Sequence, residues 1–260
     1  MRKYKFRIIF FILCLLVVSS FSYFIWLQDK YVVPIIMYHS VDKPHHFSGI
    51  VISPEHFDKQ MKFLKKHKYY VVSLDELVVA IKEKKNLPKN SVVITFDDGN
   101  EDNYTNAFGI LKKYGFPAII FVITDLIGHD GYLTWEQLRE MEKSGITVGS
   151  HTLSHVHLPG VPLEWQSRQI KESKKVIEEK LGHPIYYFAY PSGGFSDGTK
   201  DLVEEAGYKA ACTTNRGNDR FNQDVYELKR IRFKDKDSEI AMRFKLSGFY
   251  NFFRVLKEPN

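Results

Sequence analysis

The sequence is poor in cysteine: Cys14 and Cys212 are the two among its 260 residues. Cys14 lies in an apolar N-terminal segment and cannot reach Cys212, which excludes a disulfide framework as the basis of the fold. The three residues before Cys14 lack the small side chain expected before a lipidated cysteine, which argues against a lipoprotein. The chain also has no internal repeats, no low-complexity segments and no histidine after His183. We therefore expect an ordinary globular domain with its own hydrophobic core.

Charge is absent from residues 8–27, a run of twenty residues preceded by four basic ones, Arg2, Lys3, Lys5 and Arg7. This length is what a helix needs to cross a bilayer core of ~30 Å, and the basic flank predicts a cytoplasmic N-terminus. A small-x-small site occurs at residues 20–22, but the apolar run continues past it. We expect residues 1–30 to form a cytoplasmic stub and an uncleaved signal anchor, with secretion after cleavage as the alternative. Residues 31–260 would then form one domain outside the membrane.

The positive charge of the chain is concentrated in that N-terminal segment. The net charge is +6, and residues 1–30 contribute five basic groups and one acid, which leaves 32 basic and 30 acidic residues elsewhere. An outer domain with a net charge of +2 gives no support to nucleic-acid binding.

Strand-like and helix-like segments alternate along the outer domain. The strand-like runs cover residues 34–38, 69–72, 92–96, 118–124, 146–148, 185–189 and 209–213. Two helical stretches begin at Ser53-Pro54 and at Ser73. Four more cover residues 101–114, 135–143, 163–181 and 197–206. Ser73 with Glu76 makes a capping box, and glycine follows several of these stretches. Such alternation indicates parallel strands with crossover helices, and predicts an α/β fold with a distorted barrel of about seven parallel strands.

Two adjacent carboxylates, Asp97 and Asp98, follow directly on the apolar run of residues 92–96 and precede Gly99. At the end of a strand the backbone is already turning, so both acids can face one cavity. One of them can then bind a metal ion while its neighbour handles protons.

Two histidines, His151 and His155, have a similar placement, because His151 follows the strand-like residues 146–150. Their i, i+4 separation places two imidazoles on one face of a helical turn, where both can reach a single ion. A lone HxxxH pair is more often solvated, and a lone Asp-Asp-Gly is more often a turn or a helix cap. Because both elements occur where strands end, the combination predicts a divalent-metal hydrolase site.

Six ordered segments resemble the polysaccharide deacetylases of carbohydrate esterase family four, also called the NodB-homology domain. They are residues 34–41 (PIIMYHSV), 95–99 (TFDDG), 133–138 (LTWEQL), 151–155 (HTLSH), 188–193 (FAYPSG) and 228–232 (LKRIR). The resemblance spans residues 33–235 and implies a distorted (β/α) barrel that removes N-acetyl groups from amino-sugar polymers. It also implies that Asp97 is the general base and that Asp98, His151 and His155 bind the metal.

The chain departs from the commoner layout of this family in two places. A histidine near the C-terminus usually serves as the acid, whereas the branch acting on poly-β-1,6-N-acetylglucosamine resembles a permuted arrangement in which the acid comes early. His39 matches that place, with a purely structural role inside the barrel as the alternative. Ala189 stands where the family usually has an arginine. Alternate residues of a strand face opposite ways, so only one of Arg230 and Arg232 can face the site. We expect Arg230 to supply this cation beside Asp97, with a surface ion pair as the alternative for either arginine.

The chemistry of amide hydrolysis assigns further roles. Two imidazoles and a carboxylate suit Zn²⁺, and Co²⁺ and Ni²⁺ are compatible with them. A backbone N–H after Tyr190-Pro191 is expected to stabilise the oxyanion, and a histidine suits the proton donation to the leaving amine. In a barrel of this kind His39, the two aspartates, His151 and Tyr190-Pro191 should converge on the rim at the carboxyl ends of the strands.

The expected function is removal of N-acetyl groups from an N-acetylglucosamine polymer, either peptidoglycan or an exopolysaccharide, by a monomer outside the membrane. One alternative is an O-acetyl esterase acting on acetylated xylan. The other is a cell-wall-binding module that has kept the fold and lost turnover. The tail after Lys236 is basic and aromatic; a final packing helix is expected there, with contact to membrane or wall as the alternative.

Overall fold

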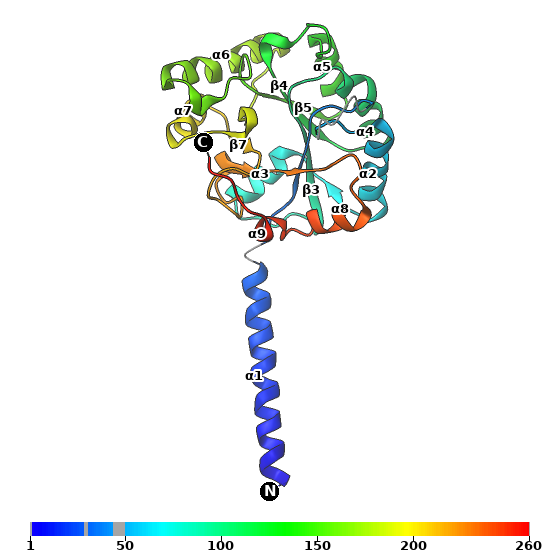
Figure 1. The fold of residues 1–260 in the computed structure, drawn as a ribbon, viewed down its shortest axis with the longest axis vertical. Helices are drawn as coiled ribbons and strands as arrows, with labels where there is room; N and C mark the ends of the chain where they lie inside the picture. Colours follow the sequence, from blue (N-terminus) through cyan, green and yellow to red (C-terminus); the bar gives the residue numbers. More distant parts are fainter. Residues whose placement is uncertain (1, 29–30, 44–49, 260) are drawn as a thin grey trace.

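The structure, a computed structural model, describes the backbone of residues 2–28, 31–43 and 50–259. Helix α1 (Arg2–Gln28) extends away from the rest of the molecule (Figure 1). Its side chains are described for residues 4 and 10–23, and apolar ones such as Phe11 and Val17 are exposed. Within the described part of the chain, no helix has both the length and the apolar character needed to cross a membrane. The span predicted over residues 8–27 stays a prediction, because the side chains of residues 8, 9 and 24–27 lie outside the described part.

Among the described residues, nine parallel strands form one sheet that curves into a nearly closed barrel (Figure 1). The strands are β1 (Ile35–Tyr38), β2 (Tyr70–Val71), β3 (Ser91–Phe96), β4 (Ala118–Val122), β5 (Ile146–Ser150), β6 (Tyr187–Ala189), β7 (Ala210–Thr213), β8 (Leu228–Lys229) and β9 (Ile231–Arg232). Their order is β8-β7-β6-β5-β4-β3-β1-β9, and β2 pairs with β3. The prediction of a barrel is confirmed, and each of the seven predicted strands is present.

The two strands that were not predicted, β8 and β9, close the barrel. They are separated by a single residue, Arg230. β8 pairs with β7, with Leu228 opposite Cys212, whereas β9 pairs with β1, with Ile231 opposite Ile36. Residues 228–232 therefore cross from one edge of the curved sheet to the other and hold the two edges together.

Helices surround this barrel and agree with the predicted stretches. They are α2 (Pro54–Lys66), α3 (Leu74–Lys82), the π-helical η1 (Asn103–Phe108), α4 (Gly109–Tyr114), α5 (Trp135–Glu142), α6 (Leu163–Leu181), α7 (Asp197–Glu205), α8 (Glu239–Lys245) and α9 (Tyr250–Phe253). Short 3₁₀ turns are η2 (Thr124–Leu126), η3 (Leu158–Gly160), η4 (Pro191–Gly193) and η5 (Val225–Glu227). The capping box of Ser73 and Glu76 is present at the start of α3.

The two faces of each strand pack into different parts of the core. Alternate residues such as Ile94 and Phe96 belong to a large cluster shared with the surrounding helices. The intervening Val93 belongs to a smaller cluster inside the barrel, together with Phe121, the free cysteine Cys212 and side chains of α3. Because the α3 residue Asp75 accepts a hydrogen bond from Tyr187, the first residue of β6, α3 covers the amino ends of the strands. The carboxyl ends of the strands, at the opposite end of the barrel, are therefore available for the functional site.

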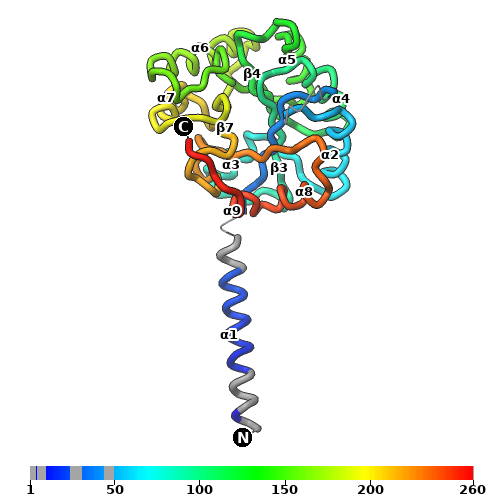
Figure 2. The backbone as a smooth tube through the Cα atoms, viewed as in Figure 1, coloured from blue at the N-terminus to red at the C-terminus, as the bar shows by residue number. Residues whose placement is uncertain are grey.

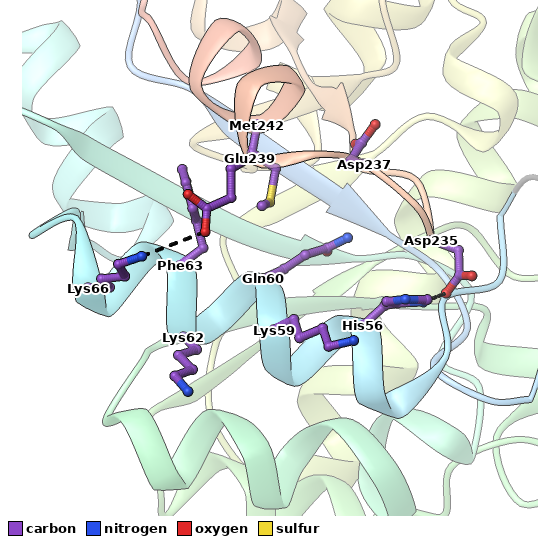
Figure 3. Close-up of a pocket in the computed structure, with 10 residues that line it drawn as sticks. All are labelled: His56, Lys59, Gln60, Lys62, Phe63, Lys66, Asp235, Asp237, Glu239 and Met242. Atoms are coloured by element: carbon purple, nitrogen blue, oxygen red, sulfur yellow. Dashed lines mark hydrogen bonds and ion pairs between the residues drawn. The ribbon is translucent and has the colours of Figure 1, made fainter.

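A cavity of about 340 Å³ lies between α2 and the segment leading into α8, away from the strand ends (Figure 3). Its charged side chains are largely paired: His56 lies 2.9 Å from Asp235, and Lys66 lies 3.7 Å from Glu239. Figure 3 shows Lys62 pointing away from these pairs. None of the predicted site residues lines this cavity.

Candidate active site

A larger cavity, of about 850 Å³, opens at the carboxyl ends of the strands. The predicted residues His39, Asp97, Asp98, His151 and His155 all line it. They follow β1, β3 and β5, so the parallel sheet brings residues from three distant parts of the chain to one rim, as barrels of this kind do.

Asp98, His151 and His155 form a compact cluster of potential metal ligands. Oδ1 of Asp98 lies 3.6 Å from Nε2 of each histidine. One ligand atom from each residue lies within 4.8 Å of the other two. Two imidazoles and one carboxylate at these separations match the ligand types of a catalytic zinc site that keeps a position open for water or substrate.

Left-handed backbone conformations orient the side chains of these potential ligands. Asp98 and Gly99 have φ of +74° and +76°, and Thr152 and His155 have φ of +71° and +58°. Non-glycine residues rarely adopt this left-handed conformation, and such residues cluster at functional sites. The chain therefore turns sharply after Asp97, through the two left-handed residues Asp98 and Gly99. The expected helical turn from His151 to His155 is wrong, because the left-handed residues make an irregular turn there.

That irregular turn is fixed from both sides. The carbonyl groups of Thr152 and Leu153 accept hydrogen bonds from the backbone N–H groups of Thr124 and Asp125, which follow β4. On the other side, the N–H of Ser154 donates to Oε1 of Gln169 in α6. These contacts allow two histidines four residues apart to face one point without a helix.

The orientation of His151 is set by a neighbouring strand. Its Nδ1 lies 2.7 Å from the carbonyl oxygen of Ala189. A carbonyl group can only accept, so Nδ1 carries the proton and Nε2 presents its lone pair towards Asp98. Burial lowers the pKa of His151 to about 4, which keeps the imidazole neutral. A neutral, oriented imidazole is the form that binds a metal ion.

The electrostatics of Asp98 also fit a bound cation. Burial, together with the negative charge of Asp97, raises the pKa of Asp98 to about 7. The nearest side-chain nitrogens belong to His151 and His155, and burial lowers the pKa of both imidazoles, which favours their neutral form. A divalent cation at this point would supply the positive charge that the carboxylate lacks, so the three residues fit a metal ion.

Asp97 has a different environment, because it is paired with Arg230. Nη1 and Nη2 of Arg230 donate to the two carboxylate oxygens at 2.6 and 2.7 Å, and both side chains are buried. Nη1 also reaches Thr95 Oγ1 at 3.1 Å, and Nε donates to the carbonyl of Thr213 at 2.9 Å. Burial alone would raise the pKa of Asp97, but Arg230 outweighs it and holds this pKa well below its usual range. Arg230, and not the exposed Arg232, therefore occupies the position beside Asp97.

His39 lies on the other side of Asp97. Its Nε2 is 3.9 Å from Asp97 Oδ2, and its Nδ1 is buried without a hydrogen-bond partner among the described residues. Burial lowers the pKa of His39 to about 4, although the Asp97 carboxylate opposes this shift. The imidazole is therefore neutral near pH 7 and free to accept a proton.

Tyr190 and Pro191 do not reach the cavity with their side chains. Tyr190 is fully buried, its ring stacks on Phe195, and its hydroxyl donates to the carbonyl of Tyr226. Among the described residues, the one from this motif that lines the cavity is Ser192, which has φ of +56°. The predicted oxyanion donor, a backbone N–H after Tyr190-Pro191, stays a prediction, and Ser192 is the residue of this motif placed to supply it.

One wall of the cavity comes from the C-terminal tail, which the sequence did not assign to the site. Figure 2 shows the red C-terminal segment beside the yellow region after β7. Hydrogen bonds from residues 195, 215–217 and 220 hold residues 251–259 in place. Tyr250, Arg254 and Lys257 consequently line the cavity. The predicted packing helix is present as α8 and α9, but its continuation is part of the site.

Comparisons with known proteins agree with this geometry. A model of the polysaccharide deacetylase family matches residues 84–211. The Bacillus subtilis protein YxkH, whose name places it in this family, is 35% identical over 199 residues, covering 76% of this chain and 70% of YxkH. The poly-β-1,6-N-acetyl-D-glucosamine N-deacetylase of Staphylococcus aureus is 30% identical over 213 residues, covering 76% of this chain and 73% of that enzyme.

The structure of the Streptococcus pyogenes deacetylase PplD in complex with acetate superimposes with a TM-score of 0.77 and 31% identity. The match covers 82% of this chain and 97% of PplD. The fold and the site thus define a hydrolase of the (β/α)-barrel class. The chain belongs to the polysaccharide deacetylase family, which confirms the resemblance carried by the six segments.

Proposed function

We propose that the protein is a metal-dependent N-deacetylase that acts on an N-acetylglucosamine polysaccharide. The observation that carries this proposal is the meeting of the Asp98, His151 and His155 cluster with the Asp97–Arg230 pair in one open cavity. The relatedness to a poly-β-1,6-N-acetyl-D-glucosamine N-deacetylase supports the choice of substrate. A wall-binding role without turnover would not need the proton-handling groups beside the cluster. An O-acetyl esterase would use the same groups, so the comparison of substrates described below is what distinguishes it.

Asp98, His151 and His155 would hold one divalent ion, with Zn²⁺ favoured by the ligand types and Co²⁺ or Ni²⁺ as alternatives. When bound, such an ion polarises the acetyl carbonyl and lowers the pKa of water from about 15.7 towards ~7.

Asp97 would accept the proton of the attacking water. Each of its oxygens accepts one hydrogen bond from Arg230, and further lone pairs remain for that proton. His39, which is neutral and 3.9 Å away, can take the proton from Asp97 and deliver it to the amine nitrogen as the carbon–nitrogen bond breaks. Acetate and a free amine result.

The developing oxyanion would be stabilised by the backbone N–H of Ser192. This residue lines the cavity, and the left-handed conformation at Ser192 turns the chain directly after Pro191. Loss of one donor of this type typically costs about 3–4 kcal/mol of transition-state stabilisation.

Acetate release from four polymers tests this function. The full-length chain is stripped of metal, reloaded with Zn²⁺ and incubated with β-1,6-linked N-acetylglucosamine oligomers, chitin oligomers, peptidoglycan and acetylated xylan. We expect acetate from an amino-sugar polymer, and a loss of about a hundredfold or more in the Asp97→Asn variant with its metal retained. Release from xylan alone would identify the protein as an O-acetyl esterase. Bound metal with no acetate from any of the four would contradict this function and favour the wall-binding module.

We further propose that residues 1–30 anchor the protein in the cell membrane and that residues 31–260 form the catalytic domain outside it. The uncharged run of residues 8–27, its basic flank and the exposed apolar side chains along α1 support this topology. In expressing cells, the full-length chain should pellet with membranes, and protease added to intact cells should digest the outer domain. A chain that begins after Ser22 and accumulates in the medium would show secretion instead, and a protease-protected domain would contradict both.

A further inference from the structure

The active-site cavity is strongly cationic, although the outer domain has a net charge of only +2. Lysine and arginine contribute seven of its lining side chains, and aspartate contributes three. The seven are Arg216, Arg230, Arg232, Lys234, Lys245, Arg254 and Lys257. A cleft with one sign of charge and low-dielectric walls raises the local concentration of oppositely charged ligands.

Internal pairing neutralises part of this charge. Arg230 is held by Asp97, and Nζ of Lys245 lies 2.5 Å from Oδ2 of Asp237. The third acid, Asp98, faces the two histidines. Of the five other cations, four form no ion pair with a carboxylate of the described residues: Arg232, Lys234, Arg254 and Lys257. The cavity therefore has positive charge available for a ligand.

Arg254 is the most informative of these cations, because it is largely buried. Its Nη1 donates to the carbonyl of Arg230 at 2.8 Å. Its Nε and Nη2 are buried and have no hydrogen-bond partner among the described residues. Desolvation, together with the nearby charge of Arg220, lowers the pKa of Arg254 to about 10, which is still high enough to keep the group charged near neutral pH. A buried, charged donor pair without acceptors is costly unless a ligand supplies them.

We propose that Arg254 forms an anion-binding subsite in this cleft, with Arg232 and Lys257, and that it takes a carboxylate or phosphate group carried by the glycan substrate. The inference rests on the proposed deacetylase function and names the substrate class: an acidic glycan. A guanidinium group suits this task because its planar set of donors matches the oxygens of a carboxylate or phosphate. The hydrogen bond from Arg254 to the backbone of Arg230 places the subsite beside the residue that holds Asp97.

A neutral glycan does not explain this arrangement. Its hydroxyl and amide groups cannot offset the charge of four cations. A glycan that has already lost acetyl groups carries protonated amines, which the same cations would repel. An acidic substituent near the target sugar is the partner that satisfies both the charge of the cleft and the unpartnered donors of Arg254.

Kinetics with three glycans of equal length test the subsite. The Zn²⁺-loaded full-length chain is given a neutral N-acetylglucosamine oligomer, one alternating with carboxylate-bearing N-acetylmuramic acid, and one carrying phosphate groups. We expect KM to be roughly tenfold lower for at least one acidic glycan, with a similar kcat, and this advantage to shrink as NaCl is added. The acidic glycan with the lower KM identifies the source of the anion.

Substitutions locate the effect. Arg254→Met should raise KM for the preferred acidic glycan about tenfold more than it raises KM for the neutral one, so that the preference for the acidic glycan is lost. Arg254→Lys should restore part of the preference. Arg232 is exposed, so Arg232→Met should not disturb packing and should raise the same KM by about threefold. Arg243→Met is the matched control, since Arg243 lies in α8 and does not line the cavity; it should leave all values unchanged.

Three results would overturn the subsite. Equal KM values for the neutral and acidic glycans would do so while leaving the deacetylase in place. An equal loss on all three glycans in Arg254→Met, without an effect of Arg232→Met, would reduce Arg254 to a structural support of the C-terminal wall. Failure of every glycan to bind or release acetate would remove the subsite together with the proposed function.

Discussion

Replacing Arg230 by methionine should lower the free energy of unfolding by about 3–5 kcal/mol and abolish deacetylation. The variant leaves Asp97 buried without its cation, and both hydrogen bonds to the carboxylate are lost. Urea denaturation and acetate release measure the two effects. The double variant Arg230→Met with Asp97→Leu should recover most of the stability and none of the activity, because no unpaired charge remains in the core. A loss of stability below about 1 kcal/mol would contradict the buried pair.

The same variant should change how stability depends on pH. In the native protein the pKa of Asp97 is depressed, so its stabilising contribution is present above the unfolded value of 3.8 and is lost as the pH falls below it. Without Arg230, burial raises this pKa above the unfolded value. The folded variant then binds the proton more tightly than the unfolded chain, so its stability falls as the pH rises. Arg230→Met should therefore be less destabilised near pH 5 than near pH 8, and the opposite order would refute this account.

Replacing His151 by alanine should reduce kcat/KM by about a thousandfold or more and prevent stoichiometric metal binding. Loss of the ion removes several kcal/mol of transition-state stabilisation, and each 1.36 kcal/mol is a factor of ten. His39→Ala is the informative comparison. It should reduce kcat/KM by about a hundredfold and leave the metal content unchanged, because His39 is expected to move a proton and not to bind the ion.

Metal analysis of the purified variants separates these roles. His129 is exposed and outside the cavity, so His129→Ala should retain both metal and activity. Loss of metal from His39→Ala would make His39 a ligand. Full metal binding in His151→Ala would show that the cluster of Asp98, His151 and His155 is not the metal site.

Most of the barrel could be predicted from the sequence because seven of its strands lie in continuous apolar runs. Residues 91–96 are buried at every position, and the apolar residues among them give a clear signal. β8 and β9 have two residues each, which is too short for any periodic pattern. They form because β7 and β1 offer open edges on both sides of residues 228–232. This tertiary pairing cannot be predicted from the local sequence.

The site was predictable where it depends on strand ends and not where it depends on distant segments. Asp97, Asp98 and His151 follow strands directly, so the register of the sheet places them together. The left-handed turn at Thr152 and His155 replaced the expected helical turn, since contacts with the segment after β4 and with α6 decide that backbone. The C-terminal wall depends on hydrogen bonds between residues about forty positions apart, such as Asn215 with Val255, which no local motif encodes.

The position of Arg230 between β8 and β9 makes the active site depend on closure of the barrel. The guanidinium reaches Asp97 only when the residues before it have paired with β7 and those after it have paired with β1. A chain whose barrel is still open has no cation beside its base, and burial would then favour the protonated, inactive form of Asp97. Deacetylation would thus require a closed barrel, so specific activity would report the fraction of correctly folded protein.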